Sequence, residues 1–154
     1  MPTAPTIRFA KQDDYPQWRP LWDGYNRFYG RFDATALPEE MTALTWSRFH
    51  DPAEAMHALV AERDGKLIGL VHYLFHRSTI LKNDTCYLQD LYTDNAARGG
   101  GTGRALIEAV YEQARQAGSH RVYWVTHETN AVAMVLYNQV AERSGFLVYR
   151  KQPL

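Results

Sequence analysis

The sequence has one cysteine, no net charge and no long apolar run, and each shortage excludes a class of protein. The single cysteine, Cys86, excludes an internal disulfide and a cysteine-rich zinc site. Seventeen basic residues balance seventeen acidic ones, so bulk charge favours neither nucleic acid nor a membrane as a partner. No run approaches the roughly 20 apolar residues of a membrane-spanning helix, and the N-terminus lacks a signal-peptide pattern. We therefore expect a cytoplasmic protein without a metal, a nucleic-acid partner or a membrane partner.

The composition favours one ordinary globular domain. The chain has 154 residues, of which 45% are hydrophobic and 13% aromatic, which is enough to build a core. Its ten glycines and seven prolines are scattered, so fibrous and low-complexity classes are excluded. No repeat and no linker divides the chain, and we expect a single domain over residues 1–154.

Aromatic residues dominate the first third of the chain. Residues 7–10 read as a short strand, and Asp13 or Asp14 offers a helix N-cap. Aromatic residues then recur at spacings of three and four, which predicts one face of a helix: Tyr15, Trp18, Trp22, Tyr25 and Tyr29. A second helix is expected from Pro38 to about His50.

The rest of the chain alternates between strand and helix patterns. Residues 58–62 and 66–75 have the form of a hairpin with Asp64-Gly65 as its turn. The later expectations are a strand over 85–93, an amphipathic helix closed by Gly118, a strand over 121–126, a helix from Asn130 to about Glu142, and a last strand over 146–149. This order predicts one α+β domain on a mixed sheet.

A glycine-rich loop is the most informative segment. It reads Arg98-Gly99-Gly100-Gly101-Thr102-Gly103-Arg104, follows an expected strand and opens an expected helix. Backbone N–H groups and a helix N-terminus suit a phosphate or pyrophosphate. The P-loop motif does not match, because it needs Lys-Ser or Lys-Thr after the last glycine and Arg104-Ala105 stands there. The dinucleotide-binding motif GxGxxG does not match either, because its third glycine would fall on Arg104 or Leu106.

The spacing Arg-x-x-Gly-x-Gly, formed by Arg98, Gly101 and Gly103, resembles the pyrophosphate loop of the GCN5-related N-acetyltransferase (GNAT) superfamily. The preceding segment, YLQDLY at 87–92, resembles that of spermidine/spermine N-acetyltransferases and related bacterial and yeast enzymes acting on polyamines, amino acids or histone tails. The resemblance covers nearly the whole chain. It implies a mostly antiparallel mixed sheet flanked by about four helices, with the fourth and fifth strands splayed apart.

The same resemblance implies acetyl-CoA as co-substrate. Its pyrophosphate would lie on the loop from Arg98 to Arg104, and its pantetheine would pair with the backbone of Leu91, Tyr92 and Thr93. Asn130 would reach the coenzyme from the start of the last helix, and it could equally serve as a helix N-cap.

Acetyl transfer needs a neutral amine, a stabilised oxyanion and a protonated leaving thiolate. The resemblance makes Tyr137 the candidate acid for the sulfur, against the alternative of a core aromatic. Gln89 stands where the polyamine enzymes carry a glutamate, and an amide orients a water or the substrate but accepts no amine proton. The base is therefore elsewhere, or the proton leaves through water. Because the side chains of a strand alternate between its two faces, we expect Asp90 to point away from Gln89 and to act as a structural acceptor for backbone groups. His127 and Glu128 are two further titratable residues that could lie near the site.

The acceptor wall in this fold is usually formed by the first two helices. We expect Phe28 and Tyr29, with Trp124, to face the acceptor, and Asp33 or Glu40 to hold a distal cation of a polyamine. The resulting prediction is an acetyl-CoA-dependent N-acetyltransferase for the primary amine of a small molecule, such as a polyamine or amino acid. Relatives imply a homodimer through the late strands. The alternatives are an acetyl-CoA-binding sensor or partner subunit with little turnover, and a nucleotide-phosphate enzyme of another class.

Overall fold

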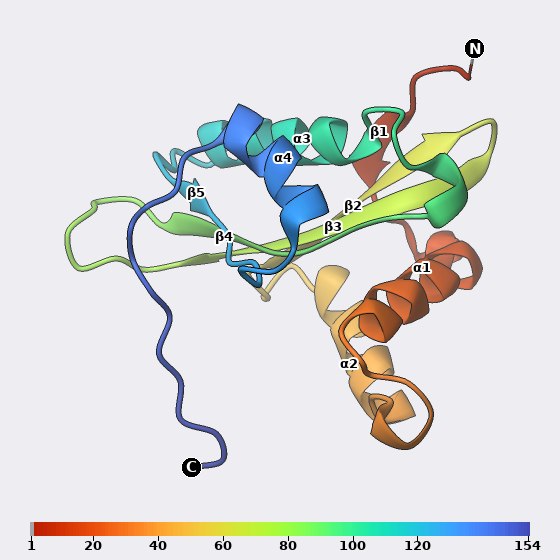
Figure 1. Cartoon of the computed structure of the whole chain (residues 1–154), viewed down its shortest axis with the longest axis horizontal. Helices are drawn as coiled ribbons and strands as arrows, with labels where there is room; N and C mark the ends of the chain where they lie inside the picture. Colours follow the sequence, from red (N-terminus) through yellow and green to blue (C-terminus); the bar gives the residue numbers. More distant parts are fainter. Residues whose placement is uncertain (1) are drawn as a thin grey trace.

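The computed structural model describes residues 2–154, which form a mixed sheet with helices on both faces (Figure 1). The strand order is β1-β2-β3-β4-β5, with β1 to β4 antiparallel and β5 parallel to β4. The strands are β1 (Thr6–Phe9), β2 (Met56–Arg63), β3 (Lys66–His76), β4 (Thr85–Thr93) and β5 (Val122–Tyr123). The helices are α1 (Tyr15–Phe28), α2 (Glu39–Phe49), α3 (Thr102–Gln116) and α4 (Ala131–Val140). The α+β class and the mixed sheet are confirmed.

Two hydrophobic clusters explain why each face of the sheet carries its own helices. The aromatic stripe of α1 and Trp46 of α2 pack on one face, against Val60 and Leu70. The apolar side of α3 packs on the other face, with α4 alongside it (Figure 1), against Leu59 and Val71. Alternating strand residues thus supply both clusters. None of the helices in residues 2–154 is long and apolar enough to cross a membrane.

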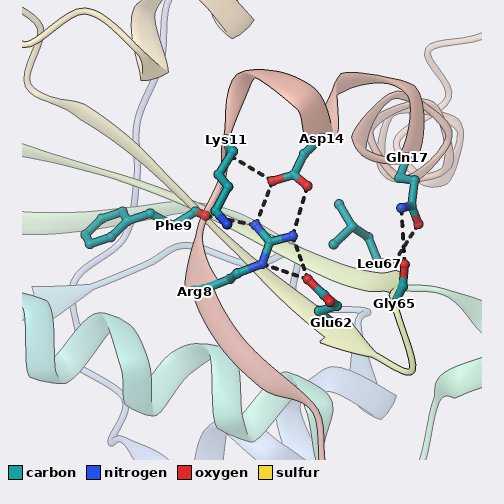
Figure 2. A network of polar contacts seen from close by, with 8 residues as sticks. All are labelled: Arg8, Phe9, Lys11, Asp14, Gln17, Glu62, Gly65 and Leu67. Carbon is teal, nitrogen blue, oxygen red and sulfur yellow. Dashed lines mark hydrogen bonds and ion pairs between the residues drawn. The ribbon is translucent and has the colours of Figure 1, made fainter.

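A polar network fixes the start of α1 to the edge of the sheet (Figure 2). Arg8 donates to both carboxylate oxygens of Asp14 and to Glu62. The hydrogen bond from Arg8 is the main cause that holds the pKa of Asp14 below its ordinary value. The side chain of Gln17 bridges the hairpin turn, donating to the Gly65 carbonyl and accepting from the Leu67 amide.

The register between β3 and β4 contains a bulge at Gln89. His72 lies opposite Asp90 and Tyr73 lies opposite Leu88, so Gln89 is an extra residue without a partner on β3. A bulge interrupts the alternation of side chains along a strand. We expected Asp90 and Gln89 to point to opposite faces because side chains alternate along a strand. The bulge interrupts that alternation in β4, so the expectation loses its basis.

The C-terminal part differs most from the sequence expectation. A strand was expected over 121–126, but only Val122 and Tyr123 pair with β4. The last helix ends at Val140, not near Glu142, and residues 141–154 form no helix or strand. The strand expected over 146–149 was therefore wrong for the single chain, because β propensity alone supplies no neighbouring strand to pair with. This segment runs away from the sheet (Figure 1), and its four apolar residues are 70–91% exposed.

Candidate active site

The parallel strands β4 and β5 meet and then separate. They pair only at Cys86–Val122 and Tyr87–Tyr123. Beyond Tyr87, no strand among the described residues pairs with β4 on this side, although β3 pairs with it as far as Thr93. Alternate residues of β4 direct backbone N–H and C=O groups to the open side. The predicted splay is confirmed, and it leaves Leu91 to Thr93 without a neighbouring strand on this side among the described residues.

The glycine loop leads directly into an uncapped helix. Gly101 is the N-cap of α3 with φ of 81°. Among residues 2–154, no side chain caps this helix, and its first turn holds no acidic residue. Ala105 donates the first helical hydrogen bond to Gly101, so the three preceding N–H groups lack helical acceptors. The Thr102 hydroxyl, buried at this helix start, has no partner among residues 2–154. Free donors at a helix N-terminus suit the oxygens of a pyrophosphate.

Three arginines surround this loop, one of which the sequence did not reveal. Arg98 donates from Nε to the Thr93 carbonyl at 3.1 Å, with its guanidinium over the Tyr92 ring. Arg104 bonds to Gln139 of α4. Arg63 is the missed residue: its Nη2 lies 3.5 Å from where a Cβ of Gly100 would be. No pattern in the sequence points to Arg63, because the folding of β2 alone brings it to the loop.

A cavity of about 410 Å³ lies between α3 and α4, beside the loop. Its lining is mainly polar and includes two cations: Arg104, Glu108, Tyr111, Arg115, Gln139 and Val140. The Tyr111 hydroxyl donates to the Val140 carbonyl at 2.8 Å and fixes the two helices to each other. Because Arg104 belongs to both the loop and the cavity, one extended anionic ligand can occupy the two together.

Tyr137 lies on α4 with its half-buried ring against Trp124, their centroids 5.4 Å apart. Burial, with a smaller effect of Tyr29, raises the pKa of Tyr137 to about 12. Its phenol is therefore protonated at neutral pH and able to donate. Trp124 also lies near Tyr111 of α3, so the structure places it with α3 and α4 and not with Phe28.

The end of α1 carries the expected aromatic wall. Phe28 and Tyr29 are 58% and 44% exposed, with ring centroids 5.1 Å apart. Arg31 lies against this wall, its guanidinium 5.4 Å from the Tyr29 centroid and 5.7 Å from that of Tyr25. Its Nε donates to Asn26 at 2.7 Å, which fixes its position. Sequence reasoning missed this cation, having looked to the acidic Asp33 and Glu40, both exposed, for substrate binding.

Two residues near the start of α4 are placed as follows. Asn130 occupies the N-cap position, but its side chain donates to the Thr126 hydroxyl and does not cap the helix. His127 is exposed and shares a hydrogen bond with Thr129 in its own turn. The contact of Asn130 with a coenzyme remains a prediction.

A buried polar chain is the second feature that sequence reasoning missed. The Trp18 indole donates to Nε2 of His72 at 3.1 Å, and Nδ1 of His72 lies 2.9 Å from Oδ2 of Asp90. All three residues are buried. Asp90 was expected to accept from backbone groups, and its partner is this histidine side chain instead.

Comparison with known proteins identifies the family. The model of the acetyltransferase (GNAT) family matches residues 18–141. The chain belongs to the GNAT family. This GNAT chain is 34% identical over 147 residues to the D-amino-acid N-acetyltransferase HPA3 of Saccharomyces cerevisiae, covering 94% of this chain and 89% of that protein. It is 29% identical over 145 residues to the uncharacterized N-acetyltransferase YhfO of Bacillus subtilis, covering 93% and 94%.

Solved structures share the fold of this GNAT domain. The aminoglycoside acetyltransferase AAC(6')-Iy, solved with a CoA-containing bisubstrate analogue, superposes with a TM-score of 0.82 at 15% identity, covering 99% of this chain and 100% of that one. Ribosomal-protein-alanine N-acetyltransferase of Brucella melitensis superposes with a TM-score of 0.78 at 21% identity, covering 97% and 99%. The family and these relatives make the chain an N-acetyltransferase.

Proposed function

We propose that this enzyme transfers the acetyl group of acetyl-CoA to the primary amine of a small, carboxylate-bearing molecule of the amino-acid class. The observation that carries the proposal is the open N-terminus of α3 beside the gap between β4 and β5, together with Tyr137 of α4, whose ring packs on Trp124 just after β5. A long ligand fits these features one after another, with its anionic middle at the helix N-terminus and a narrow chain-like arm in the gap between the strands.

The residues present fit acetyl-CoA. The N–H groups at the start of α3 and the Thr102 hydroxyl would hold the pyrophosphate, with Arg63 close enough to add charge. The backbone of Leu91 to Thr93, on the side of β4 that β5 leaves open, would pair with the pantetheine amides. The cavity between α3 and α4, with Arg104 and Arg115, would take the nucleotide end. When bound, the coenzyme supplies the thioester.

The chemistry required of the protein is proton transfer and charge stabilisation. An alkylamine has a pKa of roughly 10.4 and is mostly protonated at pH 7. A backbone N–H at the β4 opening would stabilise the oxyanion that develops on the thioester carbonyl. The Tyr137 phenol, whose pKa of about 12 keeps it protonated, would donate to the sulfur as it leaves.

The acceptor class follows from charge at the aromatic wall. Arg31, held by Asn26 beside Tyr25 and Tyr29, matches a carboxylate better than the distal ammonium of a polyamine. The similarity to a D-amino-acid N-acetyltransferase supports the same class. Gln89, exposed at the bulge, would orient the amine or a water through its amide.

Two measurements test this function. Acetyl-CoA at 100 times its Kd should stabilise the fold by about 2.7 kcal/mol, read as a rise in Tm. A thiol-release assay should then show turnover with D- or L-amino acids above that with polyamines, aminoglycosides or basic peptides. No Tm rise at saturating acetyl-CoA would overturn coenzyme binding, and preferred turnover of polyamines would overturn the acceptor class.

We also propose that the enzyme is a homodimer in which residues 146–149 of one copy pair with the sheet of the other. The segment Phe146–Tyr149 is apolar, exposed and without a strand partner in residues 2–154. β5 ends after two paired residues and leaves an open sheet edge, a template for an added strand.

Light scattering on the full chain tests this assembly. A dimer is expected for the wild type, and Phe146→Asp should shift it toward monomer. Ser144→Asp adds the same charge two residues earlier and should leave the dimer intact. A monomeric wild type at micromolar concentration would overturn the proposal.

A further inference from the structure

Asp90 is a buried carboxylate with one oxygen, Oδ2, against a histidine. The residue is 8% exposed, and Oδ2 lies 2.9 Å from Nδ1 of His72. An indole N–H only donates, so Nε2 of His72 must accept from Trp18 at 3.1 Å. His72 is therefore a neutral ring with its proton on Nδ1, donated to Asp90. This fixes the carboxylate of Asp90 as an acceptor from His72 through Oδ2.

Tyrosines from two elements surround this carboxylate. Burial first, and then the negative charge of Asp90, raise the pKa of Tyr25 on α1, of Tyr29 just after α1 and of Tyr87 on β4. A hydrogen bond to Asp90 adds to the raised pKa of Tyr25. Tyr29 also adds a smaller effect to the raised pKa of Tyr137. The groups that face Asp90 are thus His72 from β3, Tyr87 from β4, Tyr25 from α1 and Tyr29 just after α1, with Arg31 beyond the last two.

The bulge brings this carboxylate to the acceptor side. Asp90 follows directly on the exposed Gln89, and it lies on the face of the sheet that α1 covers. The same face carries the aromatic wall of Phe28 and Tyr29. Other candidates are less suitable: the Gln89 amide accepts no proton, and His127 is held in its own turn near the surface.

We propose that Asp90 is the general base of acetyl transfer, accepting a proton from the substrate ammonium through Oδ1, directly or across one water, and that His72 and Trp18 are positioning residues. This inference rests on the proposed function, because it needs an amine acceptor on the α1 face. It supplies the base that Gln89 does not.

The proton count closes with these groups. The ammonium gives one proton to Asp90, which later releases it to water. The neutral amine forms the C–N bond as the C–S bond breaks, and Tyr137 protonates the sulfur. The second proton lost by nitrogen returns to Tyr137. The net change is one ammonium and one thioester converted to one amide, one thiol and one released proton.

The test is the pH dependence of kcat/KM in Asp90→Asn. Asparagine keeps the shape and an acceptor for His72 but removes the basic oxygen. We expect kcat/KM at pH 7 to fall by about 10²- to 10⁴-fold and to recover about tenfold per pH unit as the free amine forms in solution. The matched control is Asp14→Asn, which removes another buried carboxylate, one bound by Arg8, and should leave the pH profile as in the wild type.

Outcomes separate this inference from the proposed function. Turnover by Asp90→Asn with a wild-type pH profile, or a uniform loss at all pH values, would overturn Asp90 as the base while leaving the acetyltransferase in place. Absence of turnover and of a Tm shift in the wild type would overturn the function itself. Should Asp90→Asn not fold, the wild type still decides. The wild type is then assayed with a series of amines whose pKa values run from roughly 7 to 10. If Asp90 is the base, kcat/KM should reach half of its maximum at a pH below the pKa of each amine. If the half-maximal pH instead rises with the pKa of the amine, Asp90 is not the base.

Discussion

The guanidinium of Arg8 donates to both carboxylate oxygens of Asp14, with Nη1 to Oδ2 at 2.7 Å and Nη2 to Oδ1 at 2.9 Å (Figure 2). Asp14 precedes α1, where the sequence predicted an N-cap, but its side chain accepts from Arg8 and from the Lys11 amide and does not cap α1. Strand β1 and helix α1 are thereby joined through one carboxylate. This pair positions the helix that carries the acceptor wall.

Asp14→Asn is expected to lower the free energy of unfolding by about 2 kcal/mol at pH 7, since it weakens charge-assisted bonds at a side chain only 9% exposed. Folding lowers the pKa of Asp14. The ionised carboxylate therefore stabilises the fold fully above the pKa of Asp14 in the unfolded chain, about 3.9. This stabilisation is lost as the pH falls through the pKa of Asp14 in the folded protein. Urea unfolding at pH 7 and pH 3 checks this. The difference in stability between the two proteins should be smaller at pH 3 than at pH 7, and a constant difference would contradict the assignment.

Gly101→Ala tests the loop. Gly101 has φ of 81°, and an added Cβ would meet nothing within 4 Å, so the change strains the backbone without a clash. We expect weaker acetyl-CoA binding by about tenfold, corresponding to about 1.4 kcal/mol of strain in the left-handed region. Gly145→Ala is the control, because Gly145 has φ of 83° and equally open surroundings outside the loop. Calorimetric titration should separate the two, and equal losses of affinity would argue against the loop as the anion site.

Tyr137→Phe should lower kcat by about 10- to 100-fold by removing the proton donor for the thiolate. The Kd for acetyl-CoA should change less than about twofold, because the ring and its packing on Trp124 remain. Burial raises the pKa of Tyr137 to about 12, so the wild-type kcat should show no alkaline loss below about pH 11. Stopped-flow measurement of thiol release gives both values. Unchanged turnover in the variant would make Tyr137 a packing residue.

Gln89→Glu asks whether the bulge position needs a base. If Asp90 serves that role, a second carboxylate beside it should change kcat/KM at pH 7 by less than about threefold. The steady-state rate with the best amine is the measurement. A tenfold gain or more would indicate that the wild type lacks an efficient base, contrary to the role given to Asp90.

Arg31→Gln tests the acceptor class. Loss of the cation beside Tyr29 should raise KM for an amino acid by about tenfold, in keeping with a lost charge-assisted contact of about 1.5 kcal/mol. An amine without a carboxylate should be unaffected. Arg48→Gln removes a cation from α2 that faces Glu54 and is the matched control. An equal effect of Arg31→Gln on both substrates would separate Arg31 from carboxylate recognition.

The sequence by itself determined the local elements with strong period or turn chemistry. β4 begins and ends as predicted, and Asp64-Gly65 forms the hairpin turn with both residues at positive φ. The aromatic spacing of α1 placed Trp18 and Trp22 in the core. The glycine loop could be recognised from the sequence because its backbone donors and the helix start are adjacent in the chain, so recognising them requires no long-range contact.

Only the tertiary structure decided which distant residues share a site. The bulge at Gln89 results from pairing with β3, and it interrupts the alternation on which the prediction for Asp90 relied. Arg63 at the loop, and His72 and Trp18 behind Asp90, are joined by the packing of segments up to 54 residues apart. The strand expected over 146–149 did not form, because a strand needs a partner edge and this segment leaves the sheet. Propensity and period are properties of a segment, whereas partners and burial are properties of the folded chain.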